Sequence, residues 1–288
     1  LVQWNERIVD DAETHEAVIR YRPHGVVIGI SPWNFPLLLS ANKLGQALIT
    51  GNTFILKPAP TTPATCMRLG AVCSELVPAG VVSVLPDDGA LGPYLTQHPD
   101  IAKISFTGST ETGRKVGVAA LSGLKRLTLE LGGNDAGILL DDCDVETIAP
   151  QIFTSAFTNC GQVCIAMKRV YVPRSMYGDM CDALASIADA TVVGSGLEEA
   201  VQLGPIQNKR QYDRATDLLQ SARNEGDILS GGHTLERDGY FVQPTIVSNV
   251  SDGDRIVDEE QFAPILPLIA YDDEGQVLQQ ANRSAYGL

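Results

Sequence analysis

The sequence predicts an α/β protein with two domains, each built on a sheet. From Gly25 onward, short stretches rich in Val, Ile and Leu alternate with longer stretches of helical spacing. Strands that alternate with helices indicate a parallel sheet covered by helices on both faces. The alternation pauses after the segment TLELGGN and begins again at Ala136, which predicts a domain boundary near residue 132. A chain of 288 residues is long enough for two such domains.

The chain begins with a different pattern. Residues 6–22 predict two short strands around a polar turn. A ribbon of two strands is marginally stable by itself in water, so it is expected to pack on another surface. That surface is either its own domain or a second subunit.

The predicted elements then follow in order. Pro36 is expected at the first helical position, where its missing N–H has no intrahelical partner to lose. In the first domain, the pattern predicts strands at 25–30, 53–57, 81–85, 102–106 and 126–130, with helices at 36–49, 63–77, 89–97 and 110–120. In the second domain it predicts strands at 136–140, 168–172 and 266–271, with helices at 175–190 and 206–225.

Composition excludes several classes of function. A formal net charge of −14 argues against nucleic acid or an anionic membrane surface as a partner. No apolar run reaches the roughly 18 residues that a membrane-spanning helix needs. The six cysteines show no disulfide-scaffold spacing and no secretory segment is seen, which predicts reduced thiols and a cytoplasmic location. The four histidines are scattered, so no metal site is expected.

The strongest chemical signal is the segment from Asn159 to Cys164, NCGQVC, which follows an apolar helical stretch. A glycine inside it permits a sharp turn of the backbone. A cysteine just after such a turn places a nucleophile beside backbone N–H donors, the arrangement that acyl chemistry needs. Most buried cysteines are inert packing residues, however. Cys160 is a second thiol four residues earlier, and the two could share a helical face.

Four more motifs accompany this segment, in a fixed order: SPWNFP (31–36), FTGSTETG (106–113), TLELGGN (128–134) and EEQFAP (259–264). Together the five motifs resemble the NAD(P)-dependent, non-acylating aldehyde dehydrogenase superfamily. The resemblance implies a Rossmann-like NAD(P)-binding domain at 23–132 and a catalytic domain at 133–288. It also implies that the ribbon at 1–22 joins subunits into a homodimer or homotetramer. Relative to the family, the chain is expected to be an internal fragment that lacks an N-terminal portion and a C-terminal segment.

The resemblance assigns the chemistry to three residues. It implies that the Cys164 thiolate adds to an aldehyde, and that the Asn34 amide and the Cys164 N–H hold the resulting oxyanion. It implies that Glu130 activates the water that releases a carboxylic acid. Asn34 could instead be an ordinary turn residue, and Glu130 a carboxylate at a sheet rim. A glutamate that closes an apolar strand is nevertheless expected to be partly buried.

The cofactor site must be built without the usual fingerprint, since no G-x-G-x-x-G is present. In its place, Gly108 permits close backbone approach and Ser109 or Thr110 is expected to cap the next helix. By the resemblance, Lys57 holds the adenosine ribose. The resemblance implies further cofactor contacts at Ile30, Ser31, Trp33, Gly108, Ser109, Leu131, Glu260 and Phe262.

Two departures from the family pattern bear on the cofactor. Pro60 stands where an acidic residue often grips the ribose 2′-hydroxyl, so NAD and NADP both remain open, with NAD slightly favoured. Ala263 replaces a glycine that usually precedes the proline of the last motif, which affects the backbone next to Phe262.

Several functions stay open on the sequence. The same cysteine could serve a CoA-acylating aldehyde dehydrogenase or a thiol esterase, although acylating relatives commonly lack the glutamate found at Glu130. A non-catalytic relative, or an inactive truncated one, is the alternative from another class. The substrate is expected to be a small aldehyde, and no arginine is placed to indicate an acidic one.

Overall fold

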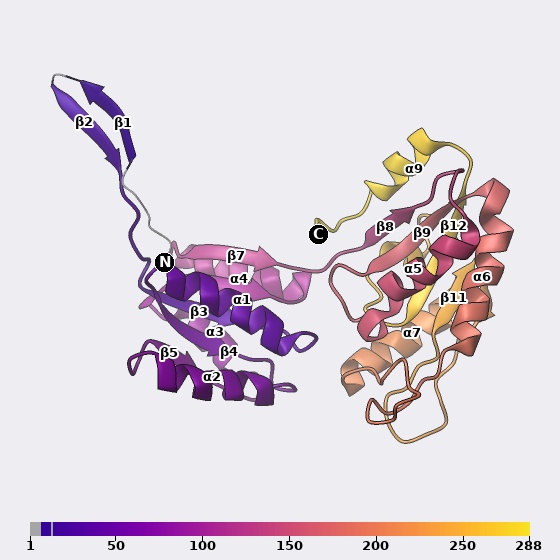
Figure 1. Ribbon diagram of the computed structural model, residues 1–288, viewed down its shortest axis with the longest axis horizontal. Helices are drawn as coiled ribbons and strands as arrows, with labels where there is room; N and C mark the ends of the chain where they lie inside the picture. The colour runs from indigo at the N-terminus through magenta and orange to yellow at the C-terminus, as the bar shows by residue number, and fades with distance from the viewer. Residues whose placement is uncertain (1–6, 13) are drawn as a thin grey trace. The chain divides into compact units, whose positions relative to one another are not determined.

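The computed structural model describes residues 7–12 and 14–288 (Figure 1). The chain divides into two compact units at Leu131 and Gly132.

The first unit begins with an antiparallel ribbon, as the sequence predicts. Strand β1 (Arg7–Ala12) pairs with β2 (His15–Ile19). The side chains of Ile8 and Val9 are exposed on the ribbon.

A five-stranded parallel sheet forms the body of this unit. Its order is β5-β4-β3-β6-β7. The strands are β3 (Val26–Ile30), β4 (Thr53–Lys57), β5 (Val82–Val84), β6 (Ile101–Thr107) and β7 (Arg126–Glu130). The chain builds outward from β3 in one direction and then crosses to β6 on its other side. The strand order therefore reverses between β3 and β6, and such a reversal is where parallel sheets bind ligands, beyond their carboxyl ends.

Four helices cover the two faces of this sheet. Helices α1 (Pro36–Ile49) and α2 (Ala64–Leu76) share a core with Val27 and Phe54, whereas α3 (Leu91–Gln97) and α4 (Thr110–Ser122) share another with Ile28 and Ile104. Val27 and Ile28 are neighbours in β3, and successive side chains of a strand point to opposite faces. The predicted parallel sheet with helices on both faces is confirmed.

The second unit contains a mixed five-stranded sheet of order β10-β11-β12-β9-β8. Strand β10 (Asp227–Ser230) runs antiparallel to β11 (Thr245–Ser248), and the other pairs are parallel. The remaining strands are β8 (Asp135–Ile138), β9 (Met167–Pro173) and β12 (Ile265–Tyr271). The helices are α5 (Val145–Phe157), α6 (Tyr177–Ala190), α7 (Lys209–Glu225), α8 (Arg255–Asp258) and α9 (Glu274–Ala281), with short 3₁₀ turns at Thr158–Gly161 and Arg174–Met176.

The prediction for this unit was incomplete. Strands β10 and β11 and helices α8 and α9 were not predicted, because three of them contain only four residues and α9 only eight, too few for a clear periodicity. The helix predicted at 206–225 begins at Lys209, because the Asn208 side chain accepts a hydrogen bond from the Gln211 N–H and caps it.

Candidate active site

The predicted cofactor residues of the first unit gather at the carboxyl edge of its sheet. Strand register places Ile30 beside both Lys57 and Phe106, and Thr107 beside Glu130. Ser31, Trp33 and Asn34 lie in the segment that leaves β3 for α1. The edge therefore brings together residues from three separate sequence motifs, together with Lys57 at the end of a fourth segment.

Glu130 is half-buried at the end of β7, as predicted, and is joined to a lysine that the sequence analysis missed. The Thr107 hydroxyl donates to Glu130 Oε2 at 2.8 Å and accepts from Lys43 Nζ at 2.5 Å. Burial lowers the pKa of Lys43, against the opposing charge of Glu130. The only signal in the sequence was a lone lysine in the otherwise uncharged helix α1.

Lys57 is buried at the end of β4 and forms an ion pair. Its Nζ lies 2.6 Å from Asp87 Oδ1, and the two side chains are 7% and 5% exposed. Asp87 also accepts a hydrogen bond from the Leu91 N–H at the start of α3. Burial alone would raise the pKa of Asp87, but the contacts with Lys57 and Leu91 lower it, so the carboxylate stays ionised. A carboxylate thus reaches Lys57 from a different loop than the one where Pro60 stands.

The turn after β6 has the features of an anion site. Of the two predicted capping residues, Ser109 and Thr110, it is Ser109 that caps α4, by accepting a hydrogen bond from the Thr112 N–H. Its neighbour Gly108 has no room for a side chain, because a Cβ would lie 2.7 Å from the ring of Phe106. Among the described residues, no partner is found for the buried hydroxyl of Ser31 at the same edge. The N-terminus of α4 and this hydroxyl suit the phosphate and hydroxyl groups of a dinucleotide.

In the second unit, residues 159–164 form a strained segment that we call the cysteine turn. Asn159, Cys160 and Gly161 have φ values of 52°, 56° and 69°, the left-handed region that residues with a Cβ rarely adopt. The possibility that Cys160 and Cys164 share a helical face is therefore not realised, because α5 ends at Phe157 and the residues from Asn159 to Gly161 are left-handed.

The two thiols of this turn have different environments. Cys160 is buried and its Sγ donates to the Gly204 carbonyl at 2.9 Å. Burial raises the pKa of Cys160 to about 12, so this thiol stays protonated at neutral pH. Cys164 is half-buried rather than sealed in the interior. The geometry thus favours Cys164 over Cys160 as a nucleophile.

The cysteine turn makes two close backbone contacts that require a glycine. A Cβ on Gly161 would overlap the carbonyl oxygen of Ala263, and a Cβ on Gly133 would lie 2.7 Å from the carbonyl oxygen of Cys164. Cys164 therefore lies in the same part of the unit as the segment that carries Glu260 and Phe262. Phe262 itself has a φ of 50°, unusual for an aromatic residue, and strain of this kind gathers at functional sites.

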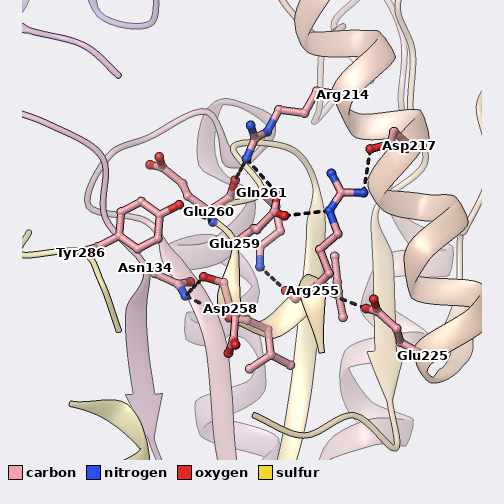
Figure 2. A network of polar contacts seen from close by, with 12 residues as sticks. Asn134, Arg214, Asp217, Glu225, Arg255, Asp258, Glu259, Glu260, Gln261 and Tyr286 are labelled. Atoms are coloured by element: carbon pink, nitrogen blue, oxygen red, sulfur yellow. Dashed lines mark hydrogen bonds and ion pairs between the residues drawn. The ribbon is translucent and has the colours of Figure 1, made fainter. Parts of the chain in front are cut away.

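Hydrogen bonds from side chains hold the backbone before Phe262 (Figure 2). Arg214 of α7 donates to the Glu260 carbonyl at 2.9 Å, and the Glu260 N–H donates to the Tyr286 hydroxyl at 3.2 Å. Gln261 donates to the Ile256 carbonyl at 2.6 Å, and Asn134 to the Val257 carbonyl at 2.9 Å. These hydrogen bonds to backbone groups fix the segment more firmly than the nearby ion pairs Arg214–Glu259 and Arg255–Asp217, which are partly exposed.

The Glu260 side chain is also fixed. Its Oε1 accepts from the Gly133 N–H at 3.2 Å, and a Cβ on Gly132 would overlap its Oε2. Burial raises the pKa of Glu260, opposed by the Gly133 N–H and by the charges of Lys168 and Arg214. The backbone N–H, the backbone carbonyl and the side-chain carboxylate of Glu260 thus each have a defined partner. Ala263, whose identity departs from the family pattern, is buried beside the cysteine turn.

The described residues contain neither a candidate membrane-spanning helix nor a candidate metal site. Within residues 7–12 and 14–288, no helix is both long and apolar enough to cross a membrane. Over the same residues, no three His, Cys, Asp or Glu side chains lie close enough together to hold a metal ion.

Comparison with known proteins gives consistent matches. A family model described as "Aldehyde dehydrogenase family" matches residues 2–288. Phenylacetaldehyde dehydrogenase from Pseudomonas fluorescens is 42% identical over 271 residues, which cover 92% of this chain and 54% of that protein. The chain thus spans about half the length of such relatives.

Two solved structures have the same fold. One is a complex of an aldehyde dehydrogenase from Bacillus cereus with NAD+, with a TM-score of 0.96, 36% identity, and coverage of 99% of this chain and 59% of that one. The other is an NADP-dependent enzyme from E. coli, with a TM-score of 0.94, 34% identity, and coverage of 99% and 60%.

Proposed function

The chain belongs to the aldehyde dehydrogenase family, and on that premise we propose that its protein oxidises an aldehyde to a carboxylic acid with NAD(P)+, using Cys164 as the nucleophile. The observation that carries this proposal is the cysteine turn. It presents a half-buried thiol at Cys164, keeps Cys160 buried and protonated, and packs beside the segment of Glu260 and Phe262.

We assign three steps to residues of this chain. The Cys164 sulfur adds to the aldehyde carbon, and the Asn34 amide and the Cys164 N–H hold the oxyanion that forms. When bound, the nicotinamide cofactor would supply the acceptor for the hydride that leaves the carbon of this adduct, and loss of that hydride would leave a thioester on Cys164. Glu130 then takes a proton from the water that cleaves the thioester. The hydrogen bond from Thr107 and the nearby charge of Lys43 support this role, because they orient one oxygen of the Glu130 carboxylate.

We propose that the cofactor lies along the carboxyl edge of the first sheet. Lys57 and Ser31 would meet the adenosine ribose, while the Gly108–Ser109 turn would face the pyrophosphate. Ile30, Trp33 and Leu131 would line the same edge, and Glu260 and Phe262 would contact the nicotinamide half.

The Lys57–Asp87 pair favours NAD over NADP. The Asp87 carboxylate already compensates the charge of Lys57, so the lysine has less attraction left for a 2′-phosphate. The same carboxylate would repel that phosphate directly. Asp87 would therefore supply the negative charge that an acidic residue in place of Pro60 would provide.

We assign the β1–β2 ribbon to subunit contact in a homodimer or homotetramer. Ile8 and Val9 are 55% and 50% exposed, and apolar side chains on such a ribbon suit burial against a partner. The mass of the protein in solution, measured with and without residues 1–22, tests this assignment.

Rapid-quench kinetics of the full-length protein with an aldehyde panel, NAD+ and no coenzyme A test the reaction. Cys164→Ala is expected to abolish cofactor reduction, whereas Cys160→Ala keeps most of it. Glu130→Gln is expected to keep the burst of reduced cofactor and to slow the steady state by about 10² or more. A requirement for coenzyme A would indicate an acylating enzyme, and equal loss of burst and steady state in Glu130→Gln would refute the role of Glu130.

A further inference from the structure

A buried lysine lies between the two strained segments of the second unit. Lys168 is the second residue of β9, four positions after Cys164, and is only 3% exposed. A buried ammonium group is costly unless it is paired and hydrogen-bonded. Its partners therefore show what the group does.

Two of these partners are carbonyl groups of the cysteine turn. Lys168 Nζ donates to the Gly161 carbonyl at 3.0 Å and to the Val163 carbonyl at 2.6 Å. These carbonyls bracket the bend that leads from left-handed Gly161 to Cys164. A single cation thus ties two points of the turn together, and charge-assisted bonds of this kind are about twice as strong as neutral ones.

The third partner belongs to the other strained segment. Lys168 Nζ lies 5.0 Å from the centroid of the Phe262 ring, within the range of a cation–π contact. The charged and titratable groups that act on the ammonium are Glu260, Asp135 and Cys164. Lys168 is therefore coupled both to the thiol and to the segment proposed to contact the nicotinamide.

We propose that Lys168 is a positioning residue of the reaction, which fixes the cysteine turn through the Gly161 and Val163 carbonyls and supplies the positive charge that favours the thiolate form of Cys164. The inference rests on the proposed function only in taking Cys164 as the nucleophile. Lys168 itself touches no reacting atom in this assignment.

The charge of Lys168 disappears at an accessible pH. Burial lowers its pKa to about 8, while the charges of Glu260, Asp135 and Cys164 raise it in part. Below pH 8 the ammonium group favours the thiolate, and above it this support is lost. A purely structural side chain would show no such dependence.

Alkylation of Cys164 by iodoacetamide tests the proposal without aldehyde oxidation. The rate is followed by peptide mass spectrometry in the full-length protein from pH 6 to 10. At pH 7, Lys168→Met is expected to slow alkylation of Cys164 about tenfold. The ratio of the wild-type rate to the variant rate should fall toward one as the pH rises past about 8. Lys209→Met is the matched control, because Lys209 is an exposed lysine of the same unit that pairs with Asp213 one turn away, and it should leave the rate unchanged.

Lys168→Arg keeps the inference testable if the methionine variant does not fold. Arginine keeps its charge over the whole range, so the variant should retain most of the rate at pH 7 and lack the bend in the pH profile near 8. Identical profiles for wild type and Lys168→Arg, or a wild-type to Lys168→Met ratio that does not change with pH, would overturn the proposal. Aldehyde oxidation by Cys164→Ala would instead overturn the proposed function and leave the alkylation result intact.

Discussion

Replacement of Gly161 by alanine tests whether the cysteine turn depends on its backbone conformation. Gly161 has a φ of 69°, and an L residue in the left-handed region costs about 1–2 kcal/mol. The new Cβ would also overlap the Ala263 carbonyl oxygen and lie 2.9 Å from its carbon. Backbone atoms cannot move aside as a flexible side chain can, so this overlap adds about 1–3 kcal/mol. We expect Gly161→Ala to lower the free energy of unfolding by about 2–5 kcal/mol.

Urea unfolding followed by circular dichroism measures this loss as a fall in the midpoint. Gly178→Ala is the matched control in the same unit, because a Cβ there meets no atom within 4 Å and the residue lies in helix α6. That variant should be as stable as wild type or more stable by up to about 1 kcal/mol. Equal midpoints for Gly161→Ala and Gly178→Ala would refute the strained turn described above.

Two further predictions concern charged side chains. Asp87→Asn should tighten NADP+ binding relative to NAD+ binding by about tenfold, because it removes the carboxylate that opposes a 2′-phosphate. Titrations with each cofactor give the ratio of the two dissociation constants independently of turnover. An unchanged ratio would show that Asp87 does not influence which cofactor binds. For Lys168, the pKa falls from 10.5 to about 8 in the folded protein, so the unfolded chain binds more protons between these values and stability rises with pH there. In urea unfolding, the free energy of unfolding of the wild type should therefore rise by about 2–3 kcal/mol relative to that of Lys168→Met between pH 8 and 10. If the free energies of unfolding of the two proteins changed with pH in the same way, the burial of a charged lysine would be contradicted.

The parts of this fold that local pattern encodes were predictable. The alternation of apolar strands with helices gave the parallel sheet, Pro36 marked the start of α1, and Ser109 marked the cap of α4. Each of these features depends on residues a few positions apart, where chain geometry fixes what is near. The family resemblance then supplied the candidate roles of Cys164 and Glu130.

The partners of these residues were not predictable, because they come from distant parts of the chain. Asp87 meets Lys57 across 30 positions of sequence, and Thr107 connects Lys43 to Glu130 from a third element. Lys43, Lys57 and Asp87 each look like a solvated surface residue when they are met alone in the sequence. Strand register and burial decide which ones meet, and neither is visible in a single sequence.

Cys160 packs in the hydrophobic core of the second unit, but directional polar contacts also hold the cysteine turn, and these have a functional reason. Its left-handed residues store strain that the surrounding structure must offset. The Gln162 amide donates to the Asn159 carbonyl at 3.0 Å and accepts from the Gln207 N–H, while the Cys160 thiol and the Lys168 ammonium bind further carbonyls. An apolar side chain could fill the same space but could not fix the direction of a carbonyl. Because the Cys164 N–H is proposed to hold an oxyanion, the orientation of the peptide groups before it must be set in advance, and directional hydrogen bonds from buried groups achieve this.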